Sequence, residues 1–133
     1  MEKTLGIIKP DAVKSGFSDD ISADIISAGF NIINSRTTTL TKEQGEQFYF
    51  VHKDREFYRG LVDFMTSGTV TLLVIEKENA VEDFRKLIGS TDPSEAIEGT
   101  IRKKYGTSIR FNAIHGSDSP SNALNEIAFF FSR

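Results

Sequence analysis

The chain contains no cysteine, and its 133 residues include only two histidines. Without cysteine it can form neither a disulfide framework nor a thiolate metal site, and His52 and His115 stand too far apart for a zinc motif. The longest apolar run near the N-terminus has four residues, far short of a signal-peptide core or a membrane span. These absences favour a cytoplasmic protein with no membrane partner.

Positive charge is also scarce, because 16 Lys and Arg stand against 19 Asp and Glu for a net charge of −3. A chain this acidic is not expected to bind nucleic acid, so any polyanion must be held by a few well-placed cations. Repeats, charge blocks and low-complexity linkers are missing, and the three prolines lie far apart. We therefore expect one domain over residues 1–133, burying roughly two-thirds of its unfolded surface.

The common nucleotide-binding motifs are absent as well. None of the ten glycines is followed by lysine, which excludes the Walker phosphate loop, and G-x-G-x-x-G, H-R-D and D-F-G do not occur. What remains is a set of isolated cations at the ends of predicted elements, namely Lys9, Arg55, Arg85 and Arg102. Arginine in particular binds phosphate oxygens in a bidentate manner, so these residues are candidate phosphate ligands.

Hydrophobic patterns and end signals predict alternating strands and helices. Strands are expected at residues 4–9, 30–39, 69–75 and 111–114. Helices are expected at 18–28, 41–51, 57–65, 79–88, 100–105 and from 120 onward, with a surface loop over 89–99. The first helix should be capped by Ser18, and two others by capping boxes at 41–44 and 79–82.

This order predicts an α/β (α+β) fold, with a ferredoxin-like split βαβ antiparallel sheet. The helices are expected on one face of the sheet, and a helical hairpin is inserted around residues 53–55. In the last helix, Leu124, Ile127 and Phe131 should point inward. Lys9 and His115 would then meet at one rim of the sheet.

His115 is the most informative residue, because Gly, Ser, Asp and Ser follow it and lack the bulk to bury an imidazole. Gly116 should leave room for a bulky group to approach the ring. Taken alone, this stretch fits a turn that caps the next helix as well as a nucleophile, since Ser119 and Pro120 form a strong helix start. A neutral imidazole carries its own lone pair, so phosphoryl transfer through a phosphohistidine would use both this histidine and the cations.

Six short motifs run through the chain in a fixed order. They are Ile8-Lys9-Pro10-Asp11, Lys53-Asp54-Arg55 with Phe57, Ser67-Gly68, residues 85–88 with Gly89-Ser90-Thr91-Asp92-Pro93, Gly99-Thr100-Ile101-Arg102, and residues 112–119. In order and spacing the chain resembles the nucleoside diphosphate kinase family from end to end. The resemblance implies a ping-pong enzyme that moves the γ-phosphate of a nucleoside triphosphate such as ATP to histidine and then to a nucleoside diphosphate, with Mg²⁺ on the phosphates.

The resemblance also implies catalytic roles. His115 would be the nucleophile, and Glu126 with Ser117 would orient its ring. Lys9 would contact the ribose and the transferring phosphate, with support from Tyr49. By pattern alone, Glu126 would be an ordinary solvated glutamate in the middle of a helix.

Nucleotide-binding roles follow in the same way. Asn112 would bind the ribose hydroxyl, and Phe57 would stack on the base without reading its edge, which implies tolerance of any base. Arg85, Thr91 and Arg102 would hold phosphates. The protein itself is expected to supply no metal ligands, because Mg²⁺ would arrive on the nucleotide. The family further implies a homo-oligomer, either a tetramer or a hexamer.

Several positions depart from the family pattern or lack a role. Thr69, Glu98, Arg110 and Phe111 are unusual, as is the stretch 15–19, but none of them removes a catalytic group. Arg55 is expected to form a structural ion pair. His52 is expected at the surface with no role.

Two other functions fit parts of the chain. The fold is shared with RNA-recognition domains, and residues 59–64 weakly match their aromatic strand motif, although they fall in a predicted helix. A phosphohistidine carrier would take phosphate from a protein partner instead of ATP. Taken singly, Lys9 could merely end a strand, Phe57 could belong to the core, and Arg85 and Arg102 could be exposed helix charges.

Overall fold

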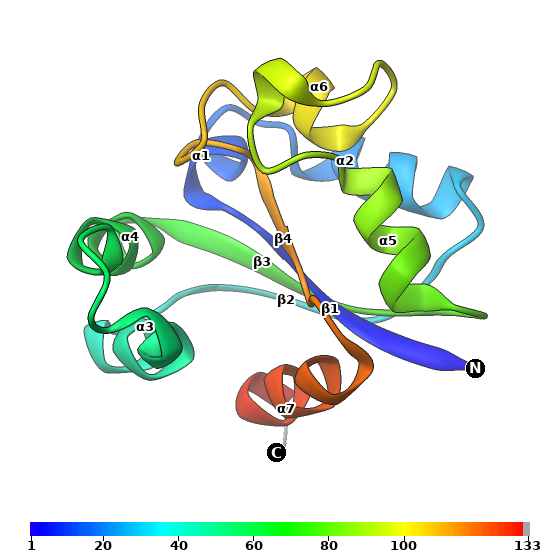
Figure 1. The fold of residues 1–133 in the computed structure, drawn as a ribbon. Helices are drawn as coiled ribbons and strands as arrows, with labels where there is room; N and C mark the ends of the chain where they lie inside the picture. The colour runs from blue at the N-terminus through cyan, green and yellow to red at the C-terminus, as the bar shows by residue number, and fades with distance from the viewer. Residues whose placement is uncertain (132–133) are drawn as a thin grey trace.

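A four-stranded antiparallel sheet forms the centre of the computed structural model, which describes residues 1–131 (Figure 1). The strand order is β2-β3-β1-β4, so the first strand lies inside the sheet and pairs with both β3 and the late strand β4. The strands are β1 (Glu2–Ile8), β2 (Asn31–Thr39), β3 (Thr69–Lys77) and β4 (Ile114–Gly116). The predicted α/β (α+β), ferredoxin-like antiparallel fold is confirmed.

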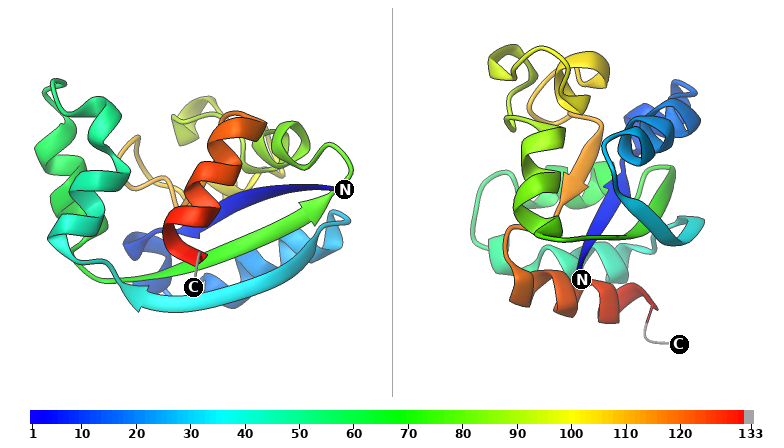
Figure 2. Two further views of the ribbon diagram at one scale, coloured as in Figure 1. Left: turned by 90° about the horizontal axis from the view of Figure 1, so that it is seen from below. Right: turned by 90° about the vertical axis from the view of Figure 1, so that its right-hand side faces the viewer.

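Helices lie on both faces of this sheet (Figure 2). The helices are α1 (Pro10–Lys14), α2 (Ser18–Ser27), α3 (Lys42–Phe48), α4 (Tyr58–Met65), α5 (Ala80–Ile88), α6 (Ile101–Tyr105) and α7 (Pro120–Phe131). Short 3₁₀ turns occur at Phe50–His52 and Pro93–Glu95. Within residues 1–131, no helix combines the length and the apolar character needed to cross a membrane.

The expectation that the helices cover one face is wrong, and the burial of the central strand gives the reason. Leu5, Ile7 and Ile8 of β1 are all fully buried, although successive side chains of a strand point to opposite faces. Ile8 joins a cluster with α2, α5 and α6, whereas Leu5 and Ile7 join a second cluster with α4 and α7. A sheet that is apolar on both sides requires cover on both sides.

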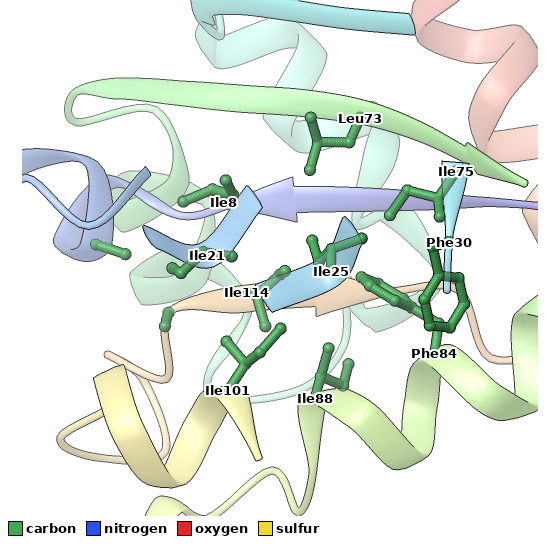
Figure 3. Packing of buried hydrophobic residues seen from close by; sticks show 12 residues of the cluster. Ile8, Ile21, Ile25, Phe30, Leu73, Ile75, Phe84, Ile88, Ile101 and Ile114 are labelled. Atoms are coloured by element: carbon green, nitrogen blue, oxygen red, sulfur yellow. The ribbon is translucent and has the colours of Figure 1, made fainter. Parts of the chain in front are cut away.

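The first cluster packs α2 and α5 against the sheet (Figure 3). Ile21 and Ile25 of α2 meet Phe84 of α5 above Ile8 and Ile75, and all five side chains are fully buried. Truncating a buried phenylalanine of this kind costs about 3–5 kcal/mol of stability. This cluster fixes α5, and with it the loop that follows α5, over the end of β1.

The second cluster packs α7 against the opposite face of the sheet. Phe130 packs with Leu5 and Ile7, and the predicted inward residues Ile127 and Phe131 are partly buried against the same group. Leu124, in contrast, is 63% exposed, so its predicted inward orientation is wrong. The apolar stripe of α7 is narrower than its composition suggests.

Helix ends follow local signals in some places. The capping box of Thr41 and Gln44 is present at the start of α3, and Thr100 accepts a hydrogen bond from the backbone of Lys103 at the start of α6. The hydroxyl of Ser119 accepts from the backbone N–H of Asn122 at 3.1 Å. These three predicted helix starts are confirmed.

Other ends depend on distant residues. Asn79 has a left-handed conformation and no side-chain cap, so the predicted capping box at 79–82 is wrong. The N-terminus of α5 is satisfied instead by Glu2, whose carboxylate accepts from the N–H of Val81 at 2.8 Å. The cap of α2 is Phe17 and not Ser18, and a helix at 10–14 was not predicted.

Candidate active site

A cleft of about 1070 Å³ opens where the ends of β1 and β4 meet the loop after α5. The structure brings nine of the ten predicted site residues to its walls, and the tenth, Ser117, is fully buried behind them. The nine are Lys9, Tyr49, Phe57, Arg85, Thr91, Arg102, Asn112, His115 and Glu126. They come from segments between residue 9 and residue 126, so their convergence is a property of the tertiary fold.

His115 lies on β4, where it pairs with Ile7 of β1. Its Nε2 is 2.9 Å from Oε1 of Glu126, and the hydroxyl of Ser117 donates to the same oxygen at 2.7 Å. The Ser117 hydroxyl in turn accepts from the backbone N–H of Leu5 at 3.3 Å. Glu126 is therefore tied to the sheet through Ser117 and is not a freely solvated helix residue.

This arrangement selects one tautomer of the imidazole. An ionised carboxylate can only accept hydrogen bonds, so Nε2 must carry the proton in its contact with Glu126. The lone pair of the neutral ring then resides on Nδ1. The ring of Phe48 packs edge-to-face against the imidazole at 5.4 Å, and 19% of the histidine side chain is exposed. The imidazole is thus held in one orientation, with part of the ring exposed to the cleft.

Gly116 has a different role from the one expected. A Cβ atom at this position would lie 3.0 Å from side-chain atoms of Ile88 and Phe84. The glycine therefore allows α5 to approach β4 closely, and it does not open space above the imidazole.

Lys9 is buried at the end of β1, with only 8% of its surface exposed. Its Nζ donates to Oδ1 of Asn112 at 2.8 Å, and the amide of Asn112 donates to the carbonyl of Thr91 at 3.1 Å. Burial and, to a smaller extent, the positive charge of Arg102 lower the pKa of Lys9 to about 8. The positive charge of this buried ammonium group is only partly balanced by its neighbours, so the group is suited to bind an anion.

Arg102 extends from α6 into the base of the same cleft. Its Nη1 donates to the carbonyl of Gly89 at 3.0 Å and its Nη2 donates to the carbonyl of Ile114 at 2.8 Å, while Nε is buried without a partner in the described part of the chain. Burial lowers the pKa of Arg102 to about 10, and the charge of Arg85 contributes in the same direction. Arg102 thus braces the loop after α5 against β4, and the second N–H of each Nη stays available.

Phe57 stands at the mouth of the cleft, 41% exposed at the start of α4. The guanidinium of Arg55 lies 5.6 Å from its ring centre, and the ring of His52 lies 5.3 Å away. Within residues 1–131 Arg55 makes no ion pair, so the predicted ion pair is not found. His52 lines the cleft, which its assignment as a plain surface residue did not anticipate.

Sequence reasoning missed further cleft residues. Phe48 packs on His115, and Ile109 and Arg110 line the wall beside Asn112. The guanidinium of Arg110 rests on α4, where a Cβ at Gly60 would meet its Nη1 at 2.7 Å. The unusual Arg-Phe pair before Asn112 was the available signal for Arg110.

Tyr49 is buried beside the cleft, and its hydroxyl has no partner among residues 1–131. Burial raises the pKa of this hydroxyl, so it stays protonated. The described residues contain no group of three His, Asp or Glu side chains that could hold a metal ion. The cleft places the hydrogen-bonded imidazole of His115 among several cations. A nucleophile of this kind beside several cations, on a ferredoxin-like sheet, is an arrangement suited to phosphoryl transfer.

Comparison with known proteins gives the particular family. The family model for nucleoside diphosphate kinase matches residues 2–133. A nucleoside diphosphate kinase of Persephonella marina is 50% identical over 133 residues, covering 100% of this chain and 95% of the relative. The chain belongs to the nucleoside diphosphate kinase family, which confirms the resemblance inferred from its motifs. Enzymes of this family transfer phosphate in a ping-pong manner through a phosphohistidine.

Solved structures agree. The nucleoside diphosphate kinase of Aquifex aeolicus superposes with a TM-score of 0.96 at 43% identity, covering 98% of this chain and 94% of that one. A halophilic nucleoside diphosphate kinase from Halobacterium salinarum, solved in complex with CDP, superposes with a TM-score of 0.95 at 36% identity, covering 99% and 88%. The ferredoxin-like architecture is therefore that of the family.

Proposed function

We propose that this chain is a nucleoside diphosphate kinase in which His115 carries the phosphate. Nδ1 of His115 attacks the γ-phosphorus of ATP or another nucleoside triphosphate, the bond to the β–γ bridging oxygen breaks, and the diphosphate leaves. In the second half-reaction, a terminal oxygen of another diphosphate attacks the same phosphorus and the N–P bond breaks. The observation that carries this proposal is the Ser117–Glu126–His115 hydrogen-bond chain at the wall of a cationic cleft.

Glu126 stabilises the phosphorylated ring. When Nδ1 bonds to phosphorus, the imidazole gains positive charge while Nε2 keeps its proton. A carboxylate at 2.9 Å from Nε2 makes a charge-assisted hydrogen bond in that state, which is stronger than the bond to the neutral ring. Ser117 prevents Glu126 from turning away, because its hydroxyl is fixed between Glu126 and the backbone of β1.

The cations hold the phosphates on which the ring acts. Lys9 would bind the transferring phosphate and the ribose, helped by Asn112, its present partner. Arg85 and Arg102, with the hydroxyl of Thr91, would bind the phosphates of the nucleotide. These groups act on atoms that every nucleotide shares.

The base would stack on Phe57, whose exposed ring stands at the mouth of the cleft, with Tyr49 supporting Lys9 from inside. Stacking of this kind reads no base edge, so specificity for the base should be low. Following the family, we assign Mg²⁺ to the phosphates of the bound nucleotide, where it would neutralise their charge.

The setting of the enzyme follows from its family and composition. We assign it to the cytoplasm, since the chain lacks cysteine. We further propose that it forms a symmetric homo-oligomer, either a tetramer or a hexamer. Its partners would be nucleoside triphosphates and diphosphates, while its acidic balance disfavours nucleic acid.

The proposal is tested by incubating the protein with γ-labelled ATP and Mg²⁺. We expect an acid-labile, base-stable label that GDP or UDP removes as triphosphate. His115→Ala should take no label, and the matched variant His52→Ala should still take it. Label on His52, or a label that no diphosphate removes, would contradict the proposal; the second result would indicate a phosphohistidine carrier. Tight, steeply salt-dependent binding of single-stranded RNA would favour the RNA-binding alternative.

A further inference from the structure

A strained turn immediately precedes the proposed nucleophile. Ala113 has a φ of +76°, one of two positive values among the non-glycine residues at 1–131. The N–H of Ile114 donates to the carbonyl of Asn112 at 2.9 Å across Ala113, which closes a three-residue γ-turn of the rare, strained hand. Backbone in such a conformation persists only where the surrounding structure holds it.

Hydrogen bonds from residues at the end of β1 and the start of α1 hold Ala113 in this conformation. The N–H of Ala113 donates to Oδ2 of Asp11 at 3.2 Å, and the carbonyl of Ala113 accepts from the N–H of Lys9 at 2.8 Å. Pro10 begins the helix α1 between these two residues, so the backbone N–H of Lys9 and the carboxylate of Asp11 face the turn together. Both backbone polar groups of Ala113 are therefore bound by one short segment from the other end of the chain.

The turn sets the geometry of two proposed site residues. Asn112 is its first residue and bonds to Lys9 and Thr91 through its side chain, and His115 comes directly after its last residue. An extended Ala113 would continue β4 backward, as the sequence pattern predicted for residues 111–114, and would displace Asn112 from Lys9. The γ-turn is the reason why β4 begins only at Ile114.

Asp11 is in the first turn of α1, where backbone N–H groups of Asp11 and Ala12 also stabilise its carboxylate. It does not line the cleft, so it does not meet the nucleotide. Burial raises the pKa of its carboxyl, which means that the ionised form is costly to keep, although backbone N–H groups and the charge of Lys9 offset part of that cost. Outside its own helix, the hydrogen-bond partner of this partly buried carboxylate among the described residues is the N–H of Ala113.

We propose that Asp11 is a positioning residue whose carboxylate holds Ala113 in the γ-turn and thereby places Asn112 and His115 for phosphoryl transfer. This inference rests on the proposed function of His115. The role is indirect, because Asp11 acts through the backbone of Ala113 and touches neither the phosphate nor the imidazole.

The test measures single-turnover labelling of the protein by γ-labelled ATP. Asp11→Ala should slow labelling about tenfold or more, since the strained turn loses one of its two tertiary bonds. Asp11→Asn should stay within about threefold of wild type, because its amide oxygen still accepts from Ala113. The matched control is Asp19→Ala, which removes an exposed carboxylate from the first turn of α2 and should label at the wild-type rate.

The decisive variant combines Asp11→Ala with Ala113→Gly. Glycine adopts φ near +76° without the steric penalty of a Cβ, so the turn should no longer need the carboxylate and labelling should recover most of the lost rate. A carboxylate that merely stabilised α1 or the fold as a whole would not be replaced by greater backbone freedom at position 113. Thermal unfolding of each variant, recorded alongside, shows that the rates belong to folded protein.

Three results would overturn the inference: wild-type labelling by folded Asp11→Ala, a double variant that folds but stays as slow as Asp11→Ala, or a double variant that does not fold. If Asp11→Ala alone fails to fold, rapid labelling by a folded double variant supports the inference. Absence of label on wild-type His115 would instead refute the proposed function, so the two failures are distinguishable.

Discussion

As the pH rises and Lys9 loses its buried charge, the free energy of unfolding should increase while enzymatic activity falls. Burial and the neighbouring Arg102 lower its pKa from the ordinary value of 10.5 to about 8. In the unfolded chain the lysine regains its ordinary pKa. The difference corresponds to about 3 kcal/mol by which the charged ammonium destabilises the folded state at pH 7.

The direction in which stability changes with pH follows from proton binding. Between pH 8 and 10.5 the unfolded chain keeps the proton on Lys9 and the folded chain loses it, so stability increases with pH across this window. Activity should do the reverse, because the neutral amine no longer attracts the transferring phosphate. We therefore expect kcat/KM to fall above about pH 8 while the folded state gains up to about 3 kcal/mol from this residue.

The measurement compares wild type with Lys9→Met, which retains the apolar stem and cannot titrate. Urea unfolding at intervals from pH 7 to pH 10 gives the stability difference between the two, and other titrating groups cancel in that difference. Lys14→Met, at an exposed position in the last turn of α1, serves as the control and should leave both profiles unchanged. A stability difference that is independent of pH, or a wild-type kcat/KM that stays level to pH 10, would refute the reasoning.

Three further predictions concern other parts of the structure. Glu126→Gln should slow phosphoenzyme formation by about tenfold to a hundredfold, the equivalent of one charge-assisted hydrogen bond; a single-turnover rate within twofold of wild type would contradict it. ADP, GDP, CDP and UDP should be accepted within about tenfold of one another, and Phe57→Ala should raise KM for all four, for purines somewhat more, whereas a thousandfold preference for one base would exclude simple stacking. Gly89→Ala should destabilise the fold by about 1–3 kcal/mol in urea unfolding, since φ is +89° and the new Cβ would meet Thr100 Oγ1 at 2.7 Å. Gly99→Ala, with φ of +93° and open space around it, should cost less, and equal costs would rule out the clash with Thr100.

Features set by neighbours in the sequence were predictable. The capping box of Thr41 and Gln44 and the helix start at Ser119 involve residues within one turn of each other, and they occur as expected. Features set by distant residues were not. Asn79 was expected to cap α5, but Glu2 from the other end of the chain occupies that N-terminus, and no local pattern reveals it.

Some residues of the cleft could likewise be predicted from the sequence, and others could not. The cations at element ends and the histidine motif could be identified from residue types, and Lys9, Arg85 and Arg102 converge with His115, whereas Arg55 does not line the cleft. Glu126 could not be selected from the helix pattern, because what distinguishes it is a bond to Ser117 and His115 that exists only in the folded chain. Phe48 and Arg110 reach the cleft through the packing of α3 and α4, which sequence spacing does not encode.

The pairing of β1 with β4 also determines when in folding the site comes into existence. These strands are separated by most of the chain, so their contact carries the largest loop-closure cost in the sheet. A partly folded chain could assemble β1, β2 and β3 with their helices and still have no site, because His115 reaches Lys9 only when β4 docks. Phosphoenzyme formation during refolding therefore reports the pairing of β1 with β4, the contact in the sheet with the largest sequence separation. It should start later than signals that report helix content.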